Sequence, residues 1–278
     1  MTGIVILNYN DYKTTSEMLD KIKNMKVLDH IVVVDNNSSD NSLKELEKYK
    51  SKKIDIVANK DNKGYAYGNN VGIKYLRDNY KCDYVFISNP DILVNEETFK
   101  VLIDDLKRVD VVAPVIKQLG EEIKGWKLPS LKKEINTITS NRLFKNESIH
   151  DKDYYKDDLN EVEVVSGCFF GIKDSALKKV NDFDEGTFLY FEENILGYNL
   201  KKNNIKTYVD DRVSVIHNLS VSVDKNVKKY KKYKILMDSL FYYERKVLKS
   251  NLVRRFILRV FYCLMIILLK IKNVGGRA

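Results

Sequence analysis

The sequence predicts an α/β fold with a mostly parallel central sheet, followed by C-terminal helices. Short apolar runs rich in β-branched residues alternate with helix-length segments through residues 1–114, which is the pattern of repeated β-α-β units. The strand-like runs are continuously apolar, as in parallel strands that helices cover on both faces. From residue 225 the pattern is helical to near the end of the chain.

Each expected element follows from its periodicity and its boundary residues. Thr14 and Glu17 are spaced as a capping box, so we expect the first helix to begin there. Residues 120–160 are polar and weakly periodic, and we expect them to form loops that face a substrate. The expected strands are residues 3–7, 30–34, 54–58, 84–87, 109–114, 162–172, 205–209 and 213–217. The expected helices are residues 14–25, 40–49, 65–78, 96–107, 173–180 and 188–203.

The composition is that of a folded protein in a reducing compartment. The chain has 278 residues, 44% of them hydrophobic, which is enough for a large α/β domain. Cys82, Cys168 and Cys263 are far apart in the sequence and form no Cys-x-x-Cys motif. This spacing excludes a disulfide framework and a zinc site of cysteines. The chain opens on a strand-like run without a basic segment, so we expect no signal peptide.

The positive charge is concentrated at the C-terminus. Residues 225–278 hold fifteen Lys/Arg and two Asp/Glu, although the net charge of the whole chain is only +9. Within them, residues 256–269 are apolar except for Arg259, a run shorter than the ~20 residues that span a bilayer. Arg259 and Lys270 are spaced to share one helix face, opposite a broad apolar surface. We expect an amphipathic helix on an anionic membrane surface; the alternative is a helix that packs on the rest of the chain or in a homodimer.

Four polar clusters follow strand-like runs, at residues 8–10, 35–38, 62–70 and 88–91. In a parallel sheet the carboxyl ends of the strands share one edge, where ligands bind, so we expect the clusters to converge. Asp35 can accept hydrogen bonds from a nucleobase or ribose, and Gly64 would let a helix N-terminus approach a diphosphate. Each cluster alone also fits ordinary turn or helix-cap chemistry. Their coincidence on one edge favours a nucleotide site.

Asp91 is the residue best placed to hold a cation. Pro90 ends the preceding strand because it cannot donate to the sheet, and Asn89 is restricted by the proline that follows it. Asp91 therefore stands on a stiff turn just past a buried strand. A hard cation prefers such oxygen ligands and keeps substrate phosphates in its shell. The alternative is that Asp91 is a plain turn residue.

Two further sites carry ionisable groups. Glu192 and Glu193 follow an aromatic run at the start of a helix, where they could be acids favoured by the helix dipole or a base with a raised pKa. His217 ends a strand, where it could be structural or a metal ligand beside a carboxylate. The sequence contains neither the Gly-x-Gly-x-x-Gly motif of dinucleotide enzymes after the first strand nor a phosphate-binding loop motif ending in Gly-Lys-Ser/Thr.

In their order along the chain and in their residues, six segments resemble motifs of the inverting glycosyltransferases of family two. They are residues 6–10, 33–40, 62–73, 89–91, 183–193 and 215–217. The resemblance covers roughly residues 1–222 and is closest to the rhamnosyltransferase-like branch that builds bacterial surface polysaccharides. It implies a GT-A fold and a catalytic domain at residues 1–222, with residues 223–278 as a basic amphipathic helical tail.

Position by position, the resemblance also implies roles for single residues. The donor-binding residues would be Asn8, Asn10, Asp35, Asn62, Gly64, Asn70 and Asn89. Asp91 and His217 would bind Mg²⁺ or Mn²⁺, and Glu193 would be the general base, with Glu192 as the other candidate. The chain departs from the family at two of these positions. Asn89 replaces the first acid of the metal-binding motif, and Glu193 stands where the family usually has Asp.

The implied reaction moves rhamnose or a similar hexose from a nucleoside-diphosphate donor to a hydroxyl group, with inversion. The acceptor would be a glycan or a polyprenyl-linked glycan, and the enzyme would be cytoplasmic and peripheral at the inner face of the cell membrane. An alternative is a catalytically inactive relative that binds sugar or scaffolds a polysaccharide assembly complex. We expect no nucleic-acid partner, because no aromatic base-stacking motif accompanies the lysines of the tail.

Overall fold

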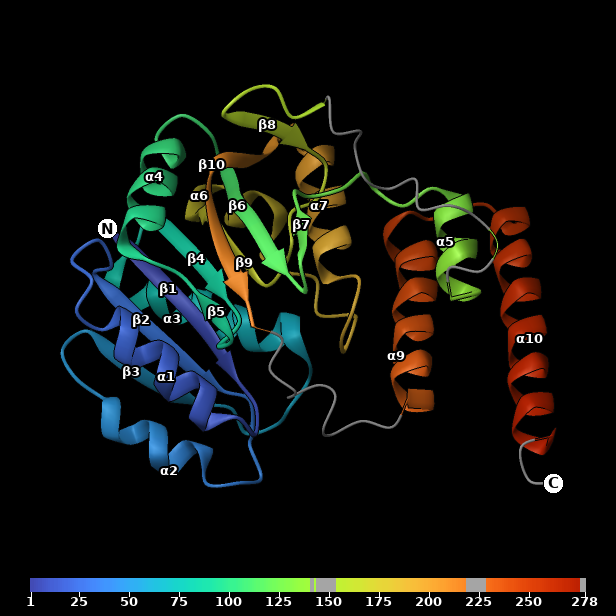
Figure 1. Ribbon diagram of the computed structural model, residues 1–278, viewed down its shortest axis with the longest axis horizontal. Helices are drawn as coiled ribbons and strands as arrows, with labels where there is room; N and C mark the ends of the chain where they lie inside the picture. The colour runs from blue at the N-terminus through green and yellow to red at the C-terminus, as the bar shows by residue number, and fades with distance from the viewer. Residues whose placement is uncertain (141–142, 144–153, 219–228, 276–278) are drawn as a thin grey trace.

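A curled, mostly parallel sheet with helices on both faces forms the larger part of the molecule, and the C-terminal helices lie to one side of it (Figure 1). The computed structural model describes residues 1–140, 143, 154–218 and 229–275. The sheet order is β3-β2-β1-β4-β9-β6-β10-β5, with β7 paired to β6 and β8 paired to β10. The strands are β1 (Thr2–Asn8), β2 (His30–Asp35), β3 (Ile54–Ala58), β4 (Tyr84–Ser88), β5 (Ile92–Leu93), β6 (Val111–Gln118), β7 (Glu121–Ile123), β8 (Leu159–Val162), β9 (Phe169–Lys173) and β10 (Thr207–His217).

The strand directions place six carboxyl ends on one edge of the sheet. β1 is parallel to β2 and β4, and β2 is parallel to β3. β9 is antiparallel to both β4 and β6, so β6 again runs in the direction of β4. β10 is parallel to β6. The carboxyl ends of β1, β2, β3, β4, β6 and β10 therefore face the same way, and the prediction of a mostly parallel sheet is confirmed.

Helices cover both faces because the strands are apolar on both. In β1, Val5 packs into one buried cluster, whereas Ile4 and Ile6 pack into the other, as the alternation of side chains along a strand requires. The first cluster receives α3, α6 and α7, and the second receives α1, α2 and α4. The helices are α1 (Tyr12–Ile22), α2 (Ser42–Leu46), α3 (Tyr65–Tyr80), α4 (Glu96–Leu106), α5 (Leu131–Ile138), α6 (Asp174–Val180), α7 (Glu192–Lys202), α9 (Lys229–Tyr242) and α10 (Leu252–Gly275), with a 3₁₀ turn at Glu47–Tyr49 and a π turn at Tyr243–Val247.

The first helix and the segment 120–160 differ from expectation. α1 begins at Tyr12 after the cap residue Asp11, so the predicted capping box at Thr14 is wrong. Thr14 lies in the first turn instead, and its hydroxyl donates to the Asp11 carboxylate (2.9 Å). The loop prediction for 120–160 is wrong where β7 and α5 form; residues 141–142 and 144–153 lie outside the described part.

The strands of the second half also differ. Residues 162–172 are not one strand, because the chain leaves β8 and pairs Val164 with Trp126 before β9 begins at Phe169. The two strands expected at 205–209 and 213–217 are one strand, β10, with a register shift between Asp210 and Ser214. Such a bulge bends a strand while it keeps its pairing with the neighbour.

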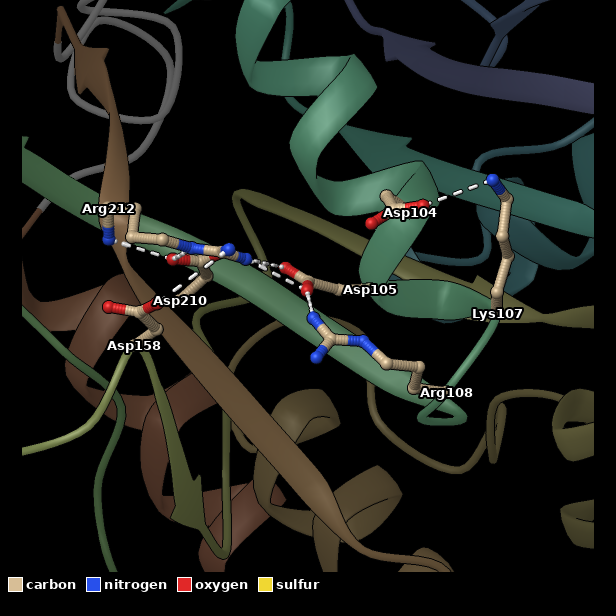
Figure 2. A network of polar contacts seen from close by, with 7 residues as sticks. All are labelled: Asp104, Asp105, Lys107, Arg108, Asp158, Asp210 and Arg212. Atoms are coloured by element: carbon tan, nitrogen blue, oxygen red, sulfur yellow. Dashed lines mark hydrogen bonds and ion pairs between the residues drawn. The ribbon is translucent and has the colours of Figure 1, made fainter.

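A charged network holds this bulge against α4 (Figure 2). The Arg212 guanidinium donates to Asp105 (2.9 and 3.0 Å) and to Asp210 (2.6 Å), and Arg108 also contacts Asp105. Burial of Asp105, together with the nearby Asp210, raises the pKa of Asp105 to about 6. Because two buried carboxylates share one guanidinium, Arg212 fixes the path of β10 toward its carboxyl end.

A third hydrophobic cluster joins α5, α9 and α10 to α7. At its polar centre, Arg254 of α10 donates to two fully buried carboxylates, Glu244 (2.9 Å) and Glu134 (2.7 Å). The predicted helical tail is therefore present, and one of its faces packs on the rest of the chain. Within the described residues, no helix is long and apolar enough to cross a membrane.

Glu134→Gln is expected to flatten the dependence of stability on pH. Burial and the neighbouring Glu244 raise the pKa of Glu134 to about 9 from its ordinary value of 4.5. The folded state therefore favours the protonated carboxyl. The stability that this protonation adds is lost as pH rises from about 4.5 to about 9. Gln keeps the shape of the side chain but cannot ionise. Urea unfolding at about pH 5, 7 and 9 should show a smaller loss of unfolding free energy in the variant than in the wild type.

The exposed Glu121 provides the matched control. Glu121→Gln should keep the wild-type loss of stability between pH 5 and 9. An equal loss in Glu134→Gln and wild type would contradict a protonated, buried Glu134.

Candidate active site

The carboxyl edge of the sheet brings together predicted site residues from distant parts of the chain. Asn8 and Asp35 are paired in register at the ends of β1 and β2. His217, the last residue of β10, is paired with Ile92 of β5, directly after Asp91. Strand pairing thus brings Asn8 to Asp35 at the end of β1, and it brings His217 to Asp91 beside β5.

Asn8 and Asp35 form a buried hydrogen-bonded pair. The Asn8 amide donates to Asp35 (2.8 Å) and to the Ser38 hydroxyl (3.2 Å), while the Ser38 N–H donates to the other Asp35 oxygen (2.9 Å). The turn interpretation of Asp35 therefore holds. The helix-cap interpretation does not, because the cap of α2 is Asn41. Asp35 is 2% exposed, and its orientation is fixed by the chain itself.

Gly64 allows the start of α3 to touch a distant loop. Its φ of 108° lies in the region that favours glycine, and a Cβ on it would lie 2.2 Å from the Phe188 carbonyl oxygen. The next residue, Tyr65, donates its N–H to that carbonyl (3.0 Å). Asn62 supports this turn, because its side-chain oxygen accepts from the Gly64 N–H (3.0 Å). Gly64 thus sits where the loop 183–191, which precedes α7, contacts α3.

Two predicted donor residues hold loops through their side chains. Asn70 donates to the Phe183 carbonyl (2.9 Å) and to Glu185 (2.8 Å), and accepts from the Phe183 N–H (3.0 Å). Asn10 accepts from the Ser39 N–H (2.7 Å), which ties together the loops after β1 and β2. In the structure, Asn70 is therefore bonded to the start of the loop 183–191, and Asn10 is bonded to the loop after β2.

Asp91 and His217 face each other across the carboxyl edge. The His217 Nε2 atom lies 3.2 Å from Asp91 Oδ1, and Nδ1 lies 2.7 Å from the Gln118 side-chain oxygen. Burial lowers the pKa of His217, but hydrogen bonds with Asp91 and Cys168 outweigh burial and raise this pKa to about 10. Without a metal the imidazole is therefore a cation paired with Asp91, and metal binding would displace a proton.

The chemistry of this pair fits a divalent cation. Neighbouring ligands around an octahedral ion with ~2.1 Å bonds lie about 3 Å apart, close to the 3.2 Å between these atoms. Within the described residues, no set of three or more His, Cys, Asp or Glu side chains is arranged to hold a metal ion. A cation here would need further ligands, such as phosphate oxygens and water, which Mg²⁺ commonly keeps.

Glu192 and Glu193 begin α7 directly after a strained turn. Tyr190 and Phe191 both have positive φ, 74° and 72°, which is rare for aromatic residues and costs energy. Such backbone outliers persist where the surrounding structure fixes them, and they occur preferentially at functional sites. Directly after this turn, the Glu192 side chain is buried and the Glu193 side chain is half-buried.

Burial raises the pKa of both carboxyl groups. The pKa of Glu192 rises to about 8, first because of burial and then because Glu193 is adjacent. Burial also raises the pKa of Glu193. At neutral pH Glu192 therefore favours its protonated form, and Glu193 is the candidate base that the family resemblance implies.

The short segment 166–168 connects the carboxyl pair to the Asp91–His217 pair. A Cβ on Gly167 would lie 3.9 Å from Glu193 Oε2, and the Tyr65 hydroxyl donates to the Gly167 carbonyl (2.5 Å). Next in the chain, Cys168 accepts the Asn89 N–H at its carbonyl (2.8 Å) and contacts His217 through its thiol. The segment therefore has Cys168 against His217 and Gly167 near Glu193.

Sequence reasoning missed several residues of this edge. Tyr65, Gly167, Cys168 and Gln118 were not predicted, nor was Trp126, whose indole N–H donates to Asn194 next to Glu193 (2.9 Å). The Ser-Gly-Cys break within the apolar run 162–172 was the available signal. A cavity of about 350 Å³ opens beside the edge; it is lined by Lys117, Gln118, Leu119, Gly120, Ile216, His217 and Asn218.

This arrangement is the GT-A fold of nucleotide-sugar-dependent glycosyltransferases. The chain matches the family described as "Glycosyl transferase family 2" over residues 3–180, and it belongs to this family. The family resemblance seen in the sequence is thereby confirmed.

Two related proteins carry functional names. The "Low-salt glycan biosynthesis hexosyltransferase Agl10" of Haloferax volcanii is 25% identical over 237 residues, which are 83% of this chain and 71% of that protein. The "Rhamnosyltransferase WbbL" of Escherichia coli K12 is 24% identical over 161 residues, which are 55% of this chain and 60% of that protein.

Solved structures share the fold at low sequence identity. GalNAc-T7 with UDP, GalNAc and Mn²⁺ has a TM-score of 0.63 at 12% identity, over 78% of this chain and 43% of that chain. S. aureus TarS 1–349 in complex with UDP-GlcNAc has a TM-score of 0.56 at 17% identity, over 91% of this chain and 77% of that chain. These likenesses confirm the fold; this chain spans less than half of the GalNAc-T7 chain.

Proposed function

We propose that this glycosyltransferase moves a hexose from a nucleoside-diphosphate sugar to a hydroxyl group of a glycan or lipid-linked glycan, with inversion. The position of segment 166–168, with Cys168 against His217 and Gly167 near Glu193, carries the proposal. It brings a candidate cation site and a candidate base to one edge of the sheet. The names of the related hexosyltransferase and rhamnosyltransferase support a hexose such as rhamnose.

The donor nucleotide would lie across the ends of β1, β2 and β4. Asp35, fixed by Asn8 and Ser38, would contact the base or ribose. The turn at Asn62 and Gly64 would lie near the diphosphate, as would Asn89. Asn10 and Asn70 would hold the loops around the donor through the bonds already described.

Asp91 and His217 would hold Mg²⁺ or Mn²⁺ together with the donor. Bound there, the cation would neutralise the charge that develops on the leaving diphosphate. The GalNAc-T7 structure, which contains both UDP and Mn²⁺, supports a divalent cation in this fold.

Glu193 would accept the proton of the acceptor hydroxyl. As the hydroxyl oxygen bonds to the anomeric carbon, the bond from that carbon to the diphosphate oxygen breaks on the opposite face, so configuration inverts. Glu193 would be the base because burial raises its pKa toward the range in which a carboxylate takes up a proton readily. Glu192 would remain the protonated neighbour.

A donor screen tests this function. Thermal unfolding of the full chain would be measured with a panel of nucleoside-diphosphate sugars, each with and without Mn²⁺, followed by assays of donor hydrolysis. We expect a rise in Tm for one nucleotide class that depends on Mn²⁺, together with slow hydrolysis of that donor. Binding without hydrolysis or transfer would favour the inactive sugar-binding relative. No Tm change with any donor would contradict the function.

We also propose that the enzyme is peripheral at the inner face of the cell membrane, with α10 as the contact. The outer face of α10 exposes large apolar side chains, each 40–76% accessible, while Leu258 and Met265 on its other face are buried. The exposed residues are Leu252, Val253, Phe256, Val260, Leu264, Ile267 and Leu268; we call them the outer stripe. Their recurrence every three or four residues gives one continuous apolar face.

Charge favours an anionic bilayer over a second copy of the chain as the partner. Apart from Arg254, which is bonded to Glu134 and Glu244, α10 carries Arg255 and Arg259, and it contains no Asp or Glu. Two copies joined through their outer stripes would bring like charges together, whereas anionic lipid would complement them. Residues 1–222 would then be the catalytic unit, with residues 223–278 as the membrane-facing extension, and the acceptor would be carried on a polyprenyl lipid.

Phe256→Asp combined with Leu264→Asp is expected to reduce vesicle binding by at least about tenfold, because each large apolar side chain contributes about 1.5–3 kcal/mol when buried. The measurement is flotation of the full chain with phosphatidylglycerol-containing vesicles and with neutral phosphatidylcholine vesicles. Leu43→Asp, at an exposed leucine on α2, is the matched control and should bind as wild type. Unchanged flotation of the double variant would contradict the membrane assignment. So would a wild type that is a dimer in solution together with a double variant that is a monomer.

A further inference from the structure

We propose that α9 of the C-terminal extension positions the loop that carries the catalytic carboxylates, with Ser239 and Tyr242 as positioning residues. The proposal rests on the function proposed above for Glu193. It makes the extension part of the catalytic apparatus as well as a membrane contact. The loop concerned is residues 183–191, directly before α7.

One side of this loop is bonded to α9. The Ser239 hydroxyl donates to the Leu189 carbonyl (2.8 Å), and the Tyr242 hydroxyl donates to the Asp184 carboxylate (2.8 Å). The Tyr242 ring also packs directly against Gly186, where a Cβ would lie 1.9 Å from the ring atom that bears the hydroxyl. Three separate points of the loop are therefore fixed by two residues that lie one turn apart on α9.

The other side of the loop is bonded to the start of α3. Tyr65 donates its N–H to the Phe188 carbonyl, and Asn70 bonds both the N–H and the carbonyl of Phe183. The loop thus lies between α3, which follows the predicted diphosphate turn, and α9. Contacts on the α3 side come from the donor-binding half of the protein, whereas those on the α9 side come from the extension.

The strained turn at the end of the loop explains why both sides are needed. Tyr190 and Phe191 hold positive φ angles, and residues in such conformations keep them only when the surrounding structure fixes them. The Phe191 ring packs 5.5 Å from the Tyr243 ring, directly after Tyr242, and both belong to the core shared by α7, α9 and α10. Loss of the α9 contacts would let the turn relax and would move Glu192 and Glu193.

Conservative variants of the full chain test this role. Tyr242→Phe removes only the hydroxyl that bonds Asp184, and Ser239→Ala removes only the bond to Leu189. We expect kcat to fall roughly ten- to hundredfold, since small misplacement of a catalytic group has effects of this size. The KM for the donor should stay within about twofold, because the α3 side of the loop is untouched. The acidic limb of the pH profile of kcat should move toward lower pH as Glu193 becomes less buried.

Tyr233→Phe is the matched control on the same helix. Its hydroxyl donates to the Ile138 carbonyl of α5 (3.0 Å) and does not contact the loop. Tyr233→Phe loses the same kind of hydrogen bond as Tyr242→Phe, so the Tm of both variants should fall by a similar amount. The kcat of Tyr233→Phe and the pH profile of kcat should stay as in the wild type. Equal kcat and equal pH profiles in Tyr242→Phe, Ser239→Ala and Tyr233→Phe would overturn the proposal.

The single tryptophan supplies a readout that needs no substrate. Trp126 bonds Asn194, which follows Glu193 in α7. Its emission maximum and its quenching by acrylamide should change in Tyr242→Phe and Ser239→Ala and not in Tyr233→Phe. Unchanged emission and quenching in all three would overturn the proposal. If no donor is turned over by the wild type, the proposed function fails, and the Trp126 comparison still decides whether α9 holds α7.

Discussion

Glu193→Gln is expected to lower kcat by about 10²–10⁴-fold, the usual contribution of a general base, and to leave the affinity for the nucleoside diphosphate unchanged. Gln keeps the size of the side chain but cannot accept the acceptor proton. The Glu193 carboxyl lies near Gly167 and Tyr65 and not beside Asp35. The substitution should therefore leave the proposed contact between Asp35 and the nucleobase or ribose undisturbed. Steady-state kinetics and calorimetric titration of the nucleotide measure the two quantities.

The pH profile of the wild type gives the sign of the effect. The base acts only when ionised, and burial raises the pKa of Glu193 above its ordinary 4.5. The acidic limb of kcat should therefore lie at higher pH than for an ordinary glutamate, and activity should fall as pH drops through it. This limb should be absent from any residual activity of Glu193→Gln.

Glu192→Gln is the matched control at the adjacent position. Since burial and Glu193 raise the pKa of Glu192 to about 8, Gln resembles its protonated state at neutral pH. We expect this variant to keep kcat within several-fold of the wild type. A large loss in Glu192→Gln alone, with turnover retained in Glu193→Gln, would make Glu192 the base and would contradict the assignment.

Asp91→Asn is expected to remove the effect of Mn²⁺ on nucleotide affinity and to lower kcat at least about 100-fold. A cation on a leaving diphosphate contributes several kcal/mol to stabilisation of the transition state, and about 2.7 kcal/mol already corresponds to this factor. Asn keeps the shape of Asp91 but removes the charge next to His217. Nucleotide affinity would be titrated with Mn²⁺ and with EDTA: the wild type should show a clear difference and the variant none.

Asp61→Asn separates this effect from a general loss of negative charge. Asp61 is an exposed acid in the loop between β3 and α3, and its replacement should leave the Mn²⁺ dependence intact. If Asp91→Asn retained the full Mn²⁺ dependence, Asp91 would not be a ligand of the cation.

The N-terminal half of the fold was predictable because its elements are defined locally. β1, β2 and β4 are continuous apolar runs, and each ends at a polar cluster, so both the strands and the shared edge followed from the sequence. The same polar ends supplied Asn8 and Asp35, whose pairing depends only on the register of adjacent parallel strands.

The second half was harder because tertiary contacts decide its structure. The run 162–172 reads as one strand by apolar content, but the pairing of Val164 with Trp126 draws it off the sheet. The resulting turn places Gly167 and Cys168 beside Glu193 and His217, so the residues that connect the two halves of the site could not be inferred from periodicity.

The C-terminal helices show the same limit. Their amphipathic character was visible, but Arg254 and its two buried glutamate partners come from α10, α5 and the π turn, which are separate segments of the chain. Likewise, the contact of Tyr242 with Gly186 joins residues from separate parts of the chain. The choice between a membrane helix and a packed helix was therefore too narrow, since α10 has one packed face and one exposed face.

A crystal structure grown with Mn²⁺ and the nucleoside diphosphate selected by the donor screen is the most direct test of the central claim. The account predicts an anomalous manganese peak bonded to Asp91 and His217 and shared with both phosphates, with the base or ribose beside Asp35. A nucleotide bound away from this edge, or manganese bonded to neither Asp91 nor His217, would contradict it.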